Sequence, residues 1–363
     1  MTTTAIPHDY PVTEANCAVK AELGIARAEW YCGPIERAEL KELMKRRDGP
    51  ALVTTGLWLG GLIVSGVCAY LLVGSWWSVP FFIVYGVLYG SSADARWHEM
   101  GHGTAFRTRW LNEVVYQLAC FMLFREPTVW RWSHARHHTN TIIVGRDPEI
   151  VATRPPHLFQ IFLYFFGITT VPKALRTLAI HAIGRMTEEE KTFVPESEWK
   201  KVYAIARIHM AIHALPFALA LYFGSWLPVM YFGVLPTMYG AWLGVYFGLT
   251  QHVGLAEDVL DHRLNSRTVH MNPVFRFIYW NMNYHVEHHI FPLVPYHALP
   301  KLHAIMSPDT PKPYPSTLAA YRDIIGAMLR QRRDPTWTIK PELPGTAKPY
   351  QPSLRPAASA SAE

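Results

Sequence analysis

Histidines are concentrated in three short stretches of this sequence. The chain has 18 histidines among 363 residues. At that composition the pattern HxxHH is expected about 0.04 times by chance, yet it occurs twice. The three stretches and their histidines are HEMGHGT at 98–104 (His98, His102), WSHARHHTNT at 132–141 (His134, His137, His138) and NYHVEHHIFP at 283–292 (His285, His288, His289). The repeated spacing indicates a shared chemical task.

That task is predicted to be metal binding. Residues at i, i+3 and i+4 of a helix share one face, so each stretch presents its imidazoles in one direction. Neutral imidazole suits Zn, Cu, Fe or Ni. Eight histidines are too many for one metal with an open coordination position, and they suit two metals with three to five nitrogens each. His252 in LTQHVGL is a ninth candidate; its position fits a metal ligand or a polar residue that ends a helix at a membrane interface equally well.

A zinc protease is the main alternative for the first stretch. HEMGH matches HExxH, in which the glutamate, here Glu99, acts as general base between two zinc ligands. Such a site needs only one further ligand, so most of the other histidines would have no role. The pattern of soluble di-iron proteins needs two copies of ExxH, whereas this sequence has one copy, Glu99 to His102. A histidine-rich site for two metals is the better interpretation.

Acidic residues near these stretches could orient the ligands. Metal-binding imidazoles usually donate their second N–H to a carboxylate. Glu287 directly precedes His288 and faces away from the ligand stripe, so it is expected to support the site rather than bind metal. The candidates for this supporting role are Asp94, Glu99, Asp147 and Glu287.

Two long uncharged segments are predicted to form the helices that position the histidines. No Asp, Glu, Lys or Arg occurs in residues 49–93 or 208–256. A helix crosses a bilayer with about 20 apolar residues, so each segment has room for two crossings. GSWW and GSWLP mark a turn near the middle of each segment, as expected for interfacial Trp beside Gly or Pro. The four predicted spans are 51–73, 79–95, 206–223 and 227–250.

Basic residues give the predicted topology. They lie before, between and after the two hairpins but not in either hairpin turn, which places both termini and all the histidine stretches in the cytoplasm. The basic residues behind the net charge of +6 are therefore expected to face lipid headgroups rather than to bind nucleic acid. Four scattered cysteines suit a reduced compartment without disulfides. A soluble protein with two very apolar helical pairs is the less favoured alternative.

Three regions are expected along the chain. Residues 1–48 form a polar cytoplasmic leader with no cleavable signal peptide, 49–330 form the membrane domain, and 331–363 form a disordered tail rich in Pro, Ala and Ser. Within the membrane domain, 158–175 is apolar but short for a span, so it is expected to be a re-entrant or interfacial helix.

The three stretches resemble the histidine boxes of the membrane fatty-acid desaturase and hydroxylase superfamily in order, spacing and flanking residues, including DPE at 147–149. The resemblance implies an all-α integral membrane protein whose four transmembrane helices carry a cytoplasmic helical cap. It implies two non-haem irons bound by the eight box histidines, with His252 as an additional ligand. Such enzymes use dioxygen and two electrons to oxidise an unactivated C–H bond.

Partners and substrate follow from the same resemblance. The chain has no CxxC pair, dinucleotide fingerprint or HPGG haem motif, so a separate ferredoxin, of Rieske type in similar bacterial proteins, and its reductase are expected to supply electrons. A lipid acyl chain is the leading substrate because the site abuts the bilayer, and the bacterial inner membrane is the expected location. The alternative is a Rieske-coupled monooxygenase that hydroxylates or demethylates a small polar or amphipathic compound. The sequence leaves desaturation against hydroxylation, and the oligomeric state, open.

Overall fold

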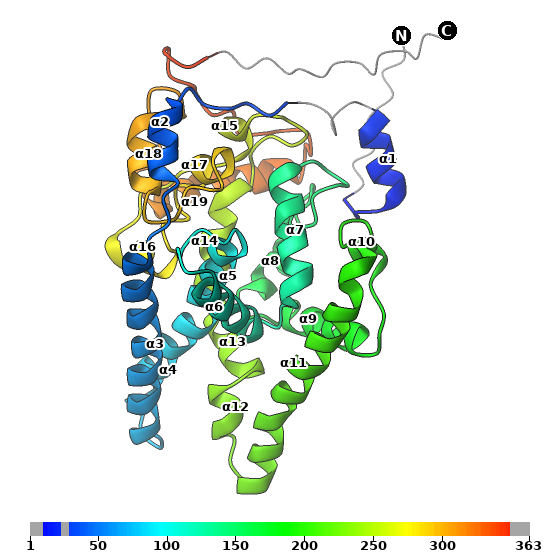
Figure 1. Ribbon diagram of the computed structural model, residues 1–363, viewed down its shortest axis with the longest axis vertical. Helices are drawn as coiled ribbons and strands as arrows, with labels where there is room; N and C mark the ends of the chain where they lie inside the picture. The colour runs from blue at the N-terminus through cyan, green and yellow to red at the C-terminus, as the bar shows by residue number, and fades with distance from the viewer. Residues whose placement is uncertain (1–9, 23–28, 349–363) are drawn as a thin grey trace.

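The computed structural model describes residues 10–22 and 29–348 (Figure 1). Every named element in those ranges is a helix, accompanied by two isolated β-bridges, Thr268 with Tyr284 and Val269 with Tyr314. The all-α prediction is therefore confirmed for the described residues. Parts of the predicted leader (1–9 and 23–28) and of the predicted tail (349–363) lie outside them.

The helices follow one another in this order: α1 (Glu14–Glu22), α2 (Arg37–Leu43), α3 (Asp48–Leu71), α4 (Ser78–Gly86), the π-helix η2 (Val87–Ser92), α5 (Ala93–Gly101), α6 (Arg109–Met122), α7 (Pro127–Thr139), α8 (Leu158–Tyr164), α9 (Thr170–Ala182), α10 (Glu188–Lys191), α11 (Glu196–Phe223), α12 (Leu227–Tyr231), α13 (Val234–Gly240), α14 (Trp242–His252), α15 (His262–Asn265), α16 (Pro273–Ile278), α17 (His285–Ile290), α18 (Leu299–Met306) and α19 (Thr317–Gln331).

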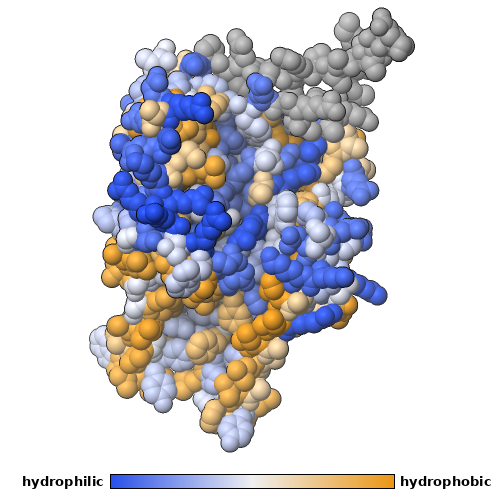
Figure 2. Space-filling model, viewed as in Figure 1, coloured by the Kyte–Doolittle hydropathy of each residue, from blue (hydrophilic) through white to orange (hydrophobic). Residues whose placement is uncertain are grey.

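Two helical stretches are long and apolar enough to cross a membrane. They are Arg37–Leu71, which contains α3, and Glu196–Phe223, which is α11. Only about a third of the most apolar window of each is buried within the protein, and side chains such as Leu71 and Leu221 are 73% and 84% exposed. Figure 2 shows this apolar surface gathered at the lower end of the molecule, where α3 and α11 end in Figure 1. Apolar area of this extent requires a nonaqueous neighbour.

The other two predicted spans differ from simple helices. Residues 78–101 form one continuous helical segment, but its middle, η2, winds as a π-helix. The fourth predicted span, 227–250, is divided into α12, α13 and α14. The break after α12 falls at Gly233, whose φ of +79° ends a helix and is readily adopted by glycine. The sequence therefore predicted the helical content of 227–250 but not its interruptions.

A glycine contact fixes the position of α5 relative to α14. A Cβ atom on Gly240 would lie 1.8 Å from the Gly86 carbonyl oxygen, and one on Gly90 would lie 2.8 Å from the Gly240 carbonyl carbon. The Ser91 hydroxyl donates to the Gly240 oxygen at 2.5 Å and accepts from the Gly244 N–H at 2.7 Å. Small residues at such a crossing let two backbones touch. α5, which carries His98 of the first histidine box, follows η2, and α14, which ends at His252, follows α13.

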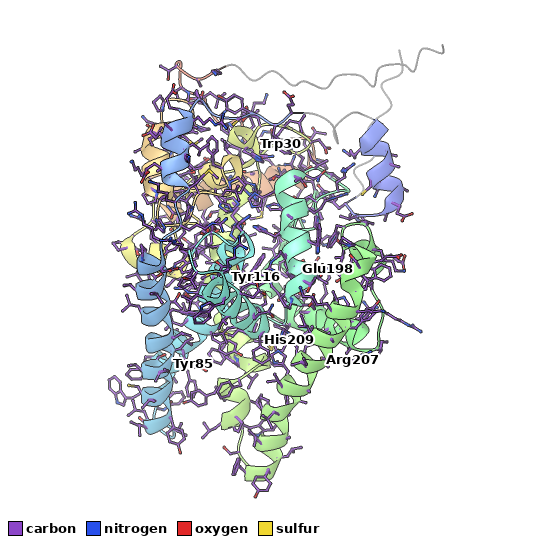
Figure 3. All side chains as sticks on the ribbon, viewed as in Figure 1. Trp30, Tyr85, Tyr116, Glu198, Arg207 and His209 are labelled. Carbon is purple, nitrogen blue, oxygen red and sulfur yellow. The ribbon has the colours of Figure 1, made fainter. Side chains whose placement is uncertain are left out.

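Tyrosines close the space beneath this crossing. The Tyr85 hydroxyl, on α4, donates to the Tyr231 carbonyl at 2.8 Å (Figure 3). The Tyr231 hydroxyl donates to the Gly66 carbonyl at 3.0 Å, and the Gly233 N–H donates to the Tyr89 hydroxyl at 3.1 Å. Each bond ties one helix of the apolar end to another, so the elements below the histidines are held rigidly together.

The segment expected as one re-entrant or interfacial helix, 158–175, contains α8 and the start of α9 instead. A turn separates the two helices, and Gly167 takes φ +64° there. Phe159 and Phe162 of α8 are 73% and 56% exposed. The segment is therefore apolar and exposed, in two short pieces rather than one helix.

Candidate metal centre

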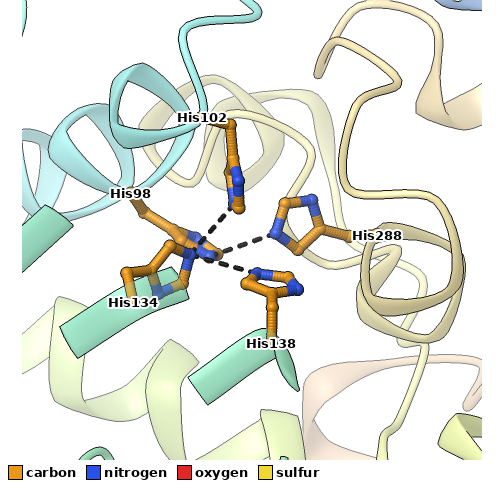
Figure 4. Close-up of side chains that lie close together, drawn as sticks. All are labelled: His98, His102, His134, His138 and His288. Atoms are coloured by element: carbon orange, nitrogen blue, oxygen red, sulfur yellow. Dashed lines mark hydrogen bonds between the residues drawn. The ribbon is translucent and has the colours of Figure 1, made fainter. Parts of the chain in front are cut away.

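Nine histidines converge in two neighbouring groups. The potential ligand atoms within each group all lie within 4.8 Å of one another. The first group, drawn in Figure 4, consists of His98, His102, His134, His138 and His288; the second consists of His137, His252, His285 and His289. The structure thus brings together all eight box histidines and His252.

Each of the two HxxHH boxes contributes histidines to both groups. On α7, the i and i+4 residues His134 and His138 join the first group, while His137 joins the second. On α17 the assignment is reversed, so that His285 and His289 join the second group and His288 joins the first. The spacing predicts that the three imidazoles of each box point in one direction, whereas the i, i+4 pair joins one group and the third histidine joins the other. α7 and α17 therefore each contribute histidines to both groups.

The ring nitrogens point at one another. The Nε2 atom of His134 lies 3.0 Å from Nε2 of His102, and Nε2 of His288 lies 3.2 Å from Nε2 of His98. In the second group, Nε2 of His285 lies 3.0 Å from Nε2 of both His252 and His289. A neutral imidazole has one N–H and one acceptor nitrogen, so several Nε2 atoms facing a common point cannot satisfy one another. A cation at that point accepts all their lone pairs.

Outer hydrogen bonds favour the tautomer that binds metal through Nε2. The His134 Nδ1 atom lies 3.1 Å from Glu149 Oε2, and His137 Nδ1 lies 2.8 Å from Asp147 Oδ2. Because a carboxylate only accepts, each Nδ1 must carry the proton and each Nε2 is left free.

The second group has two more such bonds. His252 Nδ1 lies 2.8 Å from the Asn265 carbonyl oxygen. The Thr141 hydroxyl donates to the His137 carbonyl at 2.8 Å and lies 3.1 Å from His289 Nδ1, so it can accept the proton of that nitrogen. A backbone carbonyl is an equally effective orienting partner for a metal-binding histidine. The donor set therefore fits two metal ions of a kind that imidazole binds.

Burial favours the uncharged form of eight of the nine imidazoles, all except His137. It lowers the pKa of His98, His102 and His288 well below the usual histidine value, and neighbouring imidazoles lower it further. At His137, burial lowers the pKa but the Asp147 carboxylate outweighs it and raises the pKa overall. Neutral imidazole is the form that binds a metal.

The four acids expected to support the site divide into one that contacts a histidine of the groups and three that do not. Asp147 is the one that does. Asp94 instead accepts from the Trp97 indole at 2.8 Å and pairs with Arg125 at 2.9 Å. Glu287 accepts from the Thr268 hydroxyl and from the His303 ring, so it faces away from its histidine neighbours.

Glu99 has no direct contact with the histidines. Its carboxylate accepts from the Thr104 hydroxyl at 2.7 Å and from the Tyr296 N–H at 3.1 Å, and burial raises its pKa to about 7. A general base of an HExxH protease has to reach a metal-bound water. The direction of Glu99, and the three further histidines beside His98 and His102, speak against the protease interpretation.

Sequence reasoning missed several supporting residues. Glu149 stands two residues after Asp147 in DPE and Thr141 ends the second box, so a search for acids and hydroxyls close to each box would have found both. The Asn265 carbonyl leaves no signal in the sequence. His262 was also missed: its ring lies 5.1 Å from that of His289 and stacks on Trp30, with 4.3 Å between centroids (Figure 3).

The chain is similar to several curated desaturases. Among curated proteins, the chain is 25% identical over 255 residues to an acyl-lipid omega-3 desaturase (cytochrome b5) of the endoplasmic reticulum from Arabidopsis thaliana, covering 64% of each chain. It is 25% identical over 243 residues to an acyl-lipid (9-3)-desaturase from Physcomitrium patens, covering 56% of this chain and 43% of that protein. It is 25% identical over 218 residues to a putative sphingolipid delta(4)-desaturase/C4-monooxygenase from Caenorhabditis elegans, covering 58% and 54%.

The matched region spans 43% to 64% of the length of these three relatives. The family model for fatty acid desaturase matches residues 74–321, which include all nine histidines of the two groups. That match covers more than half of the chain. The chain therefore belongs to the fatty acid desaturase family.

Proposed function

We propose that this protein is a membrane-bound, dioxygen-dependent di-iron oxidoreductase that oxidises an unactivated C–H bond, desaturating or hydroxylating the acyl chain of a lipid. The observation that carries the proposal is the pair of histidine groups, five and four residues in size, with converging ring nitrogens. Membership of the fatty acid desaturase family supports it. In this proposal the nine histidines hold the two irons, which supply the redox chemistry that activates dioxygen.

The protein's own residues keep the site in order. Glu149, Asp147, Thr141 and the Asn265 carbonyl hold protons on the outer nitrogens of four imidazoles. The close contact at Gly240 packs α13 against α4, and these elements lead into the helices that carry His252 and the first histidine box. Preorganised groups need no rearrangement during the reaction. The chain's role is thus to orient the imidazoles and to exclude water from a buried site.

The overall reaction needs an external reductant. Desaturation removes two hydrogens from adjacent carbons, and dioxygen accepts these together with two electrons and two protons to give two waters. The chain has no flavin, haem or iron–sulfur motif, so we propose a separate ferredoxin and its reductase as electron source. The proposed arrangement has four membrane crossings, with the termini and histidines on the cytoplasmic side of a bacterial inner membrane.

The test combines metal analysis with product analysis. Purified protein is assayed for iron, and vesicles containing it are supplied with oxygen, NADPH, a ferredoxin and its reductase, after which lipids and small molecules are profiled by mass spectrometry. We expect bound iron and an acyl product that is two hydrogens lighter or one oxygen heavier. His288→Ala should lose both, whereas His157→Ala, an exposed histidine outside both groups, should keep both. A fully active His288→Ala variant contradicts the proposal, and oxidation of only a small polar compound contradicts the substrate.

A further inference from the structure

A basic surface surrounds the beginning of α3. It is formed by the loop before α3, the loop that follows the first histidine box, and α18. Its exposed cations are Lys45, Arg46, Arg47, Arg107, Arg109 and Lys301; we call these six residues the basic rim. Figure 1 shows α2 and α18 next to each other above α3.

Side-chain interactions hold the parts of the basic rim together. The Asp48 carboxylate, at the start of α3, accepts from the backbone N–H and from the hydroxyl of Thr108 at 2.9 and 2.8 Å. Glu42 pairs with Lys45 and with Arg47, and its pKa is lowered by the Lys45 hydrogen bond, with smaller contributions from Arg47 and Lys301. Three separate segments of the chain therefore present their cations at one place.

The basic rim has a large excess of positive charge. Within the described residues, Arg46, Arg107, Arg109 and Lys301 form no ion pair. The nearby carboxylates are already engaged, Glu42 by two cations and Asp48 by Thr108. The Thr108 hydrogen bonds lower the Asp48 pKa, with smaller contributions from the backbone N–H and the charge of Arg107. Exposed guanidinium groups without a carboxylate partner are free to make bidentate hydrogen bonds to a phosphate.

The other long apolar helix, α11, carries a smaller excess of basic residues. It begins with acidic and basic residues whose charges balance one another, Glu196, Glu198, Lys200 and Lys201. Lys201 also lies 3.7 Å from Glu198, which is labelled in Figure 3. α11 also carries the exposed cations Lys200 and Arg207, and the Arg207 Nε donates to the Ala182 carbonyl at 2.8 Å. Exposed cations that form no ion pair with another described residue therefore occur on α11 as well, but they are fewer there than in the basic rim.

The basic rim also adjoins the candidate metal centre. Arg107 follows His102 by five residues, and the loop between them includes Gly103 at φ +68°. His102 is partly exposed rather than buried, unlike His98. At the start of α6, just after this loop, Trp110 is 65% exposed, as is typical of a side chain at the level of lipid headgroups. A lipid whose phosphate lies on the basic rim would have its acyl chains close to the first group of histidines.

We propose that the basic rim binds the phosphate of an anionic phospholipid, and that the substrate is an acyl chain carried by such a lipid. This inference rests on the proposed function for the reaction itself. Each Lys or Arg near an anionic lipid surface contributes about fivefold to binding. Removing three of the six charges should therefore weaken binding on the order of a hundredfold.

The test uses a triple variant that takes one cation from each segment, Arg46→Gln/Arg107→Gln/Lys301→Gln. Its control is Lys200→Gln/Lys201→Gln at the start of α11. The proteins are purified from vesicles with equal amounts of phosphatidylglycerol and phosphatidylcholine, and retained lipids are counted by native mass spectrometry. We expect the wild type and the control to be enriched in phosphatidylglycerol, and the triple variant to lose that enrichment. Should the triple variant fail to fold, the single variant Arg107→Gln, at an exposed residue, is expected to reduce the enrichment.

Outcomes separate this inference from the proposed function. Equal retention of the two lipids by the wild type, or no change in a folded variant, overturns the inference. Phosphatidylglycerol retention without acyl oxidation supports the basic rim and counts against the proposed reaction. Equal oxidation of both lipids without selective retention of phosphatidylglycerol supports the proposed reaction but contradicts the inference about the basic rim. A variant that keeps its lipid but no longer accepts electrons from an acidic ferredoxin would identify the basic rim as a protein-docking surface instead.

Discussion

Asp147→Asn is expected to weaken metal binding in the second histidine group. Asp147 is 2% exposed, and its carboxylate accepts from His137 Nδ1 at 2.8 Å, from the Ile142 N–H at 2.7 Å and from the Glu149 N–H at 2.8 Å. Asparagine has nearly the same shape but only one accepting oxygen. Its amide N–H would favour the His137 tautomer with the proton on Nε2, and a protonated Nε2 cannot bind metal.

The size of this effect follows from the geometry. Loss of a hydrogen-bond partner behind a metal-binding histidine costs 10- to 100-fold in metal affinity or activity, or about 1.4 to 2.7 kcal/mol. His137 is one of four residues in the second group and has no part in the first. We therefore expect the metal content of Asp147→Asn to fall from two ions per chain towards one as a chelator is titrated, with activity falling in parallel.

Glu287→Gln is the matched control. Glu287 is also a buried carboxylate within a histidine box, but it accepts from Thr268 and His303, which belong to neither group. This variant should lose thermal stability without a selective loss of one metal. The reasoning is refuted if Asp147→Asn binds two metals as tightly as the wild type, or if Glu287→Gln loses metal to the same extent.

Other predictions follow from the same contacts. Gly240→Ala should cost about 3 kcal/mol or more of stability, because its Cβ would lie 1.8 Å from the Gly86 oxygen, whereas Gly248→Ala, with nothing within 4 Å, should be neutral in a thermal melt. Thr141→Val removes the acceptor for His289 Nδ1 and should weaken metal binding about fivefold, measured by competition with a chelator; unchanged affinity would rule that contact out as a support. In metal-free protein, the buried histidines have pKa values far below the value near 6.5 of the unfolded chain. From pH 7.5 to 5.5 these histidines take up protons mainly in the unfolded chain, and they outnumber the groups that take up protons in the folded chain, which are His137 with its raised pKa and Glu99 and Glu257 with pKa values raised to about 7. The midpoint of unfolding should therefore fall as pH is lowered over this range; a flat profile would contradict the burial of neutral imidazoles.

The convergence of the histidines could be predicted from the sequence because helical spacing fixes which side chains share a face. The division into two groups could not, since it depends on how α7 and α17 face each other across the site. Acids were predicted from their proximity in sequence, which does not determine direction. Asp94 turns to Arg125, and Glu99 turns to Thr104, because these partners lie on neighbouring elements.

The membrane helices show the same limit. An absence of charge predicts apolar helix, and both α3 and α11 fall where expected. The interruptions of 227–250 fall at Gly233, with φ +79°, and just after Gly240, which contacts Gly86 154 positions away. Gly233 is a local signal that an absence of charge does not reveal, and the contact of Gly240 with Gly86 leaves no local signal, because tertiary contacts override local helical preference.

Because each HxxHH box contributes to both groups, the two groups are completed at different times as the chain is synthesised. The first group has four of its five members once residue 138 has emerged, because only His288 comes later. The second group has just His137 at that stage, gains His252, and is completed only by His285 and His289. A nascent chain therefore acquires a nearly complete first site about 150 residues before the second exists. Maturation is expected to be sequential, with the second ion captured only when α17 closes over a half-assembled centre.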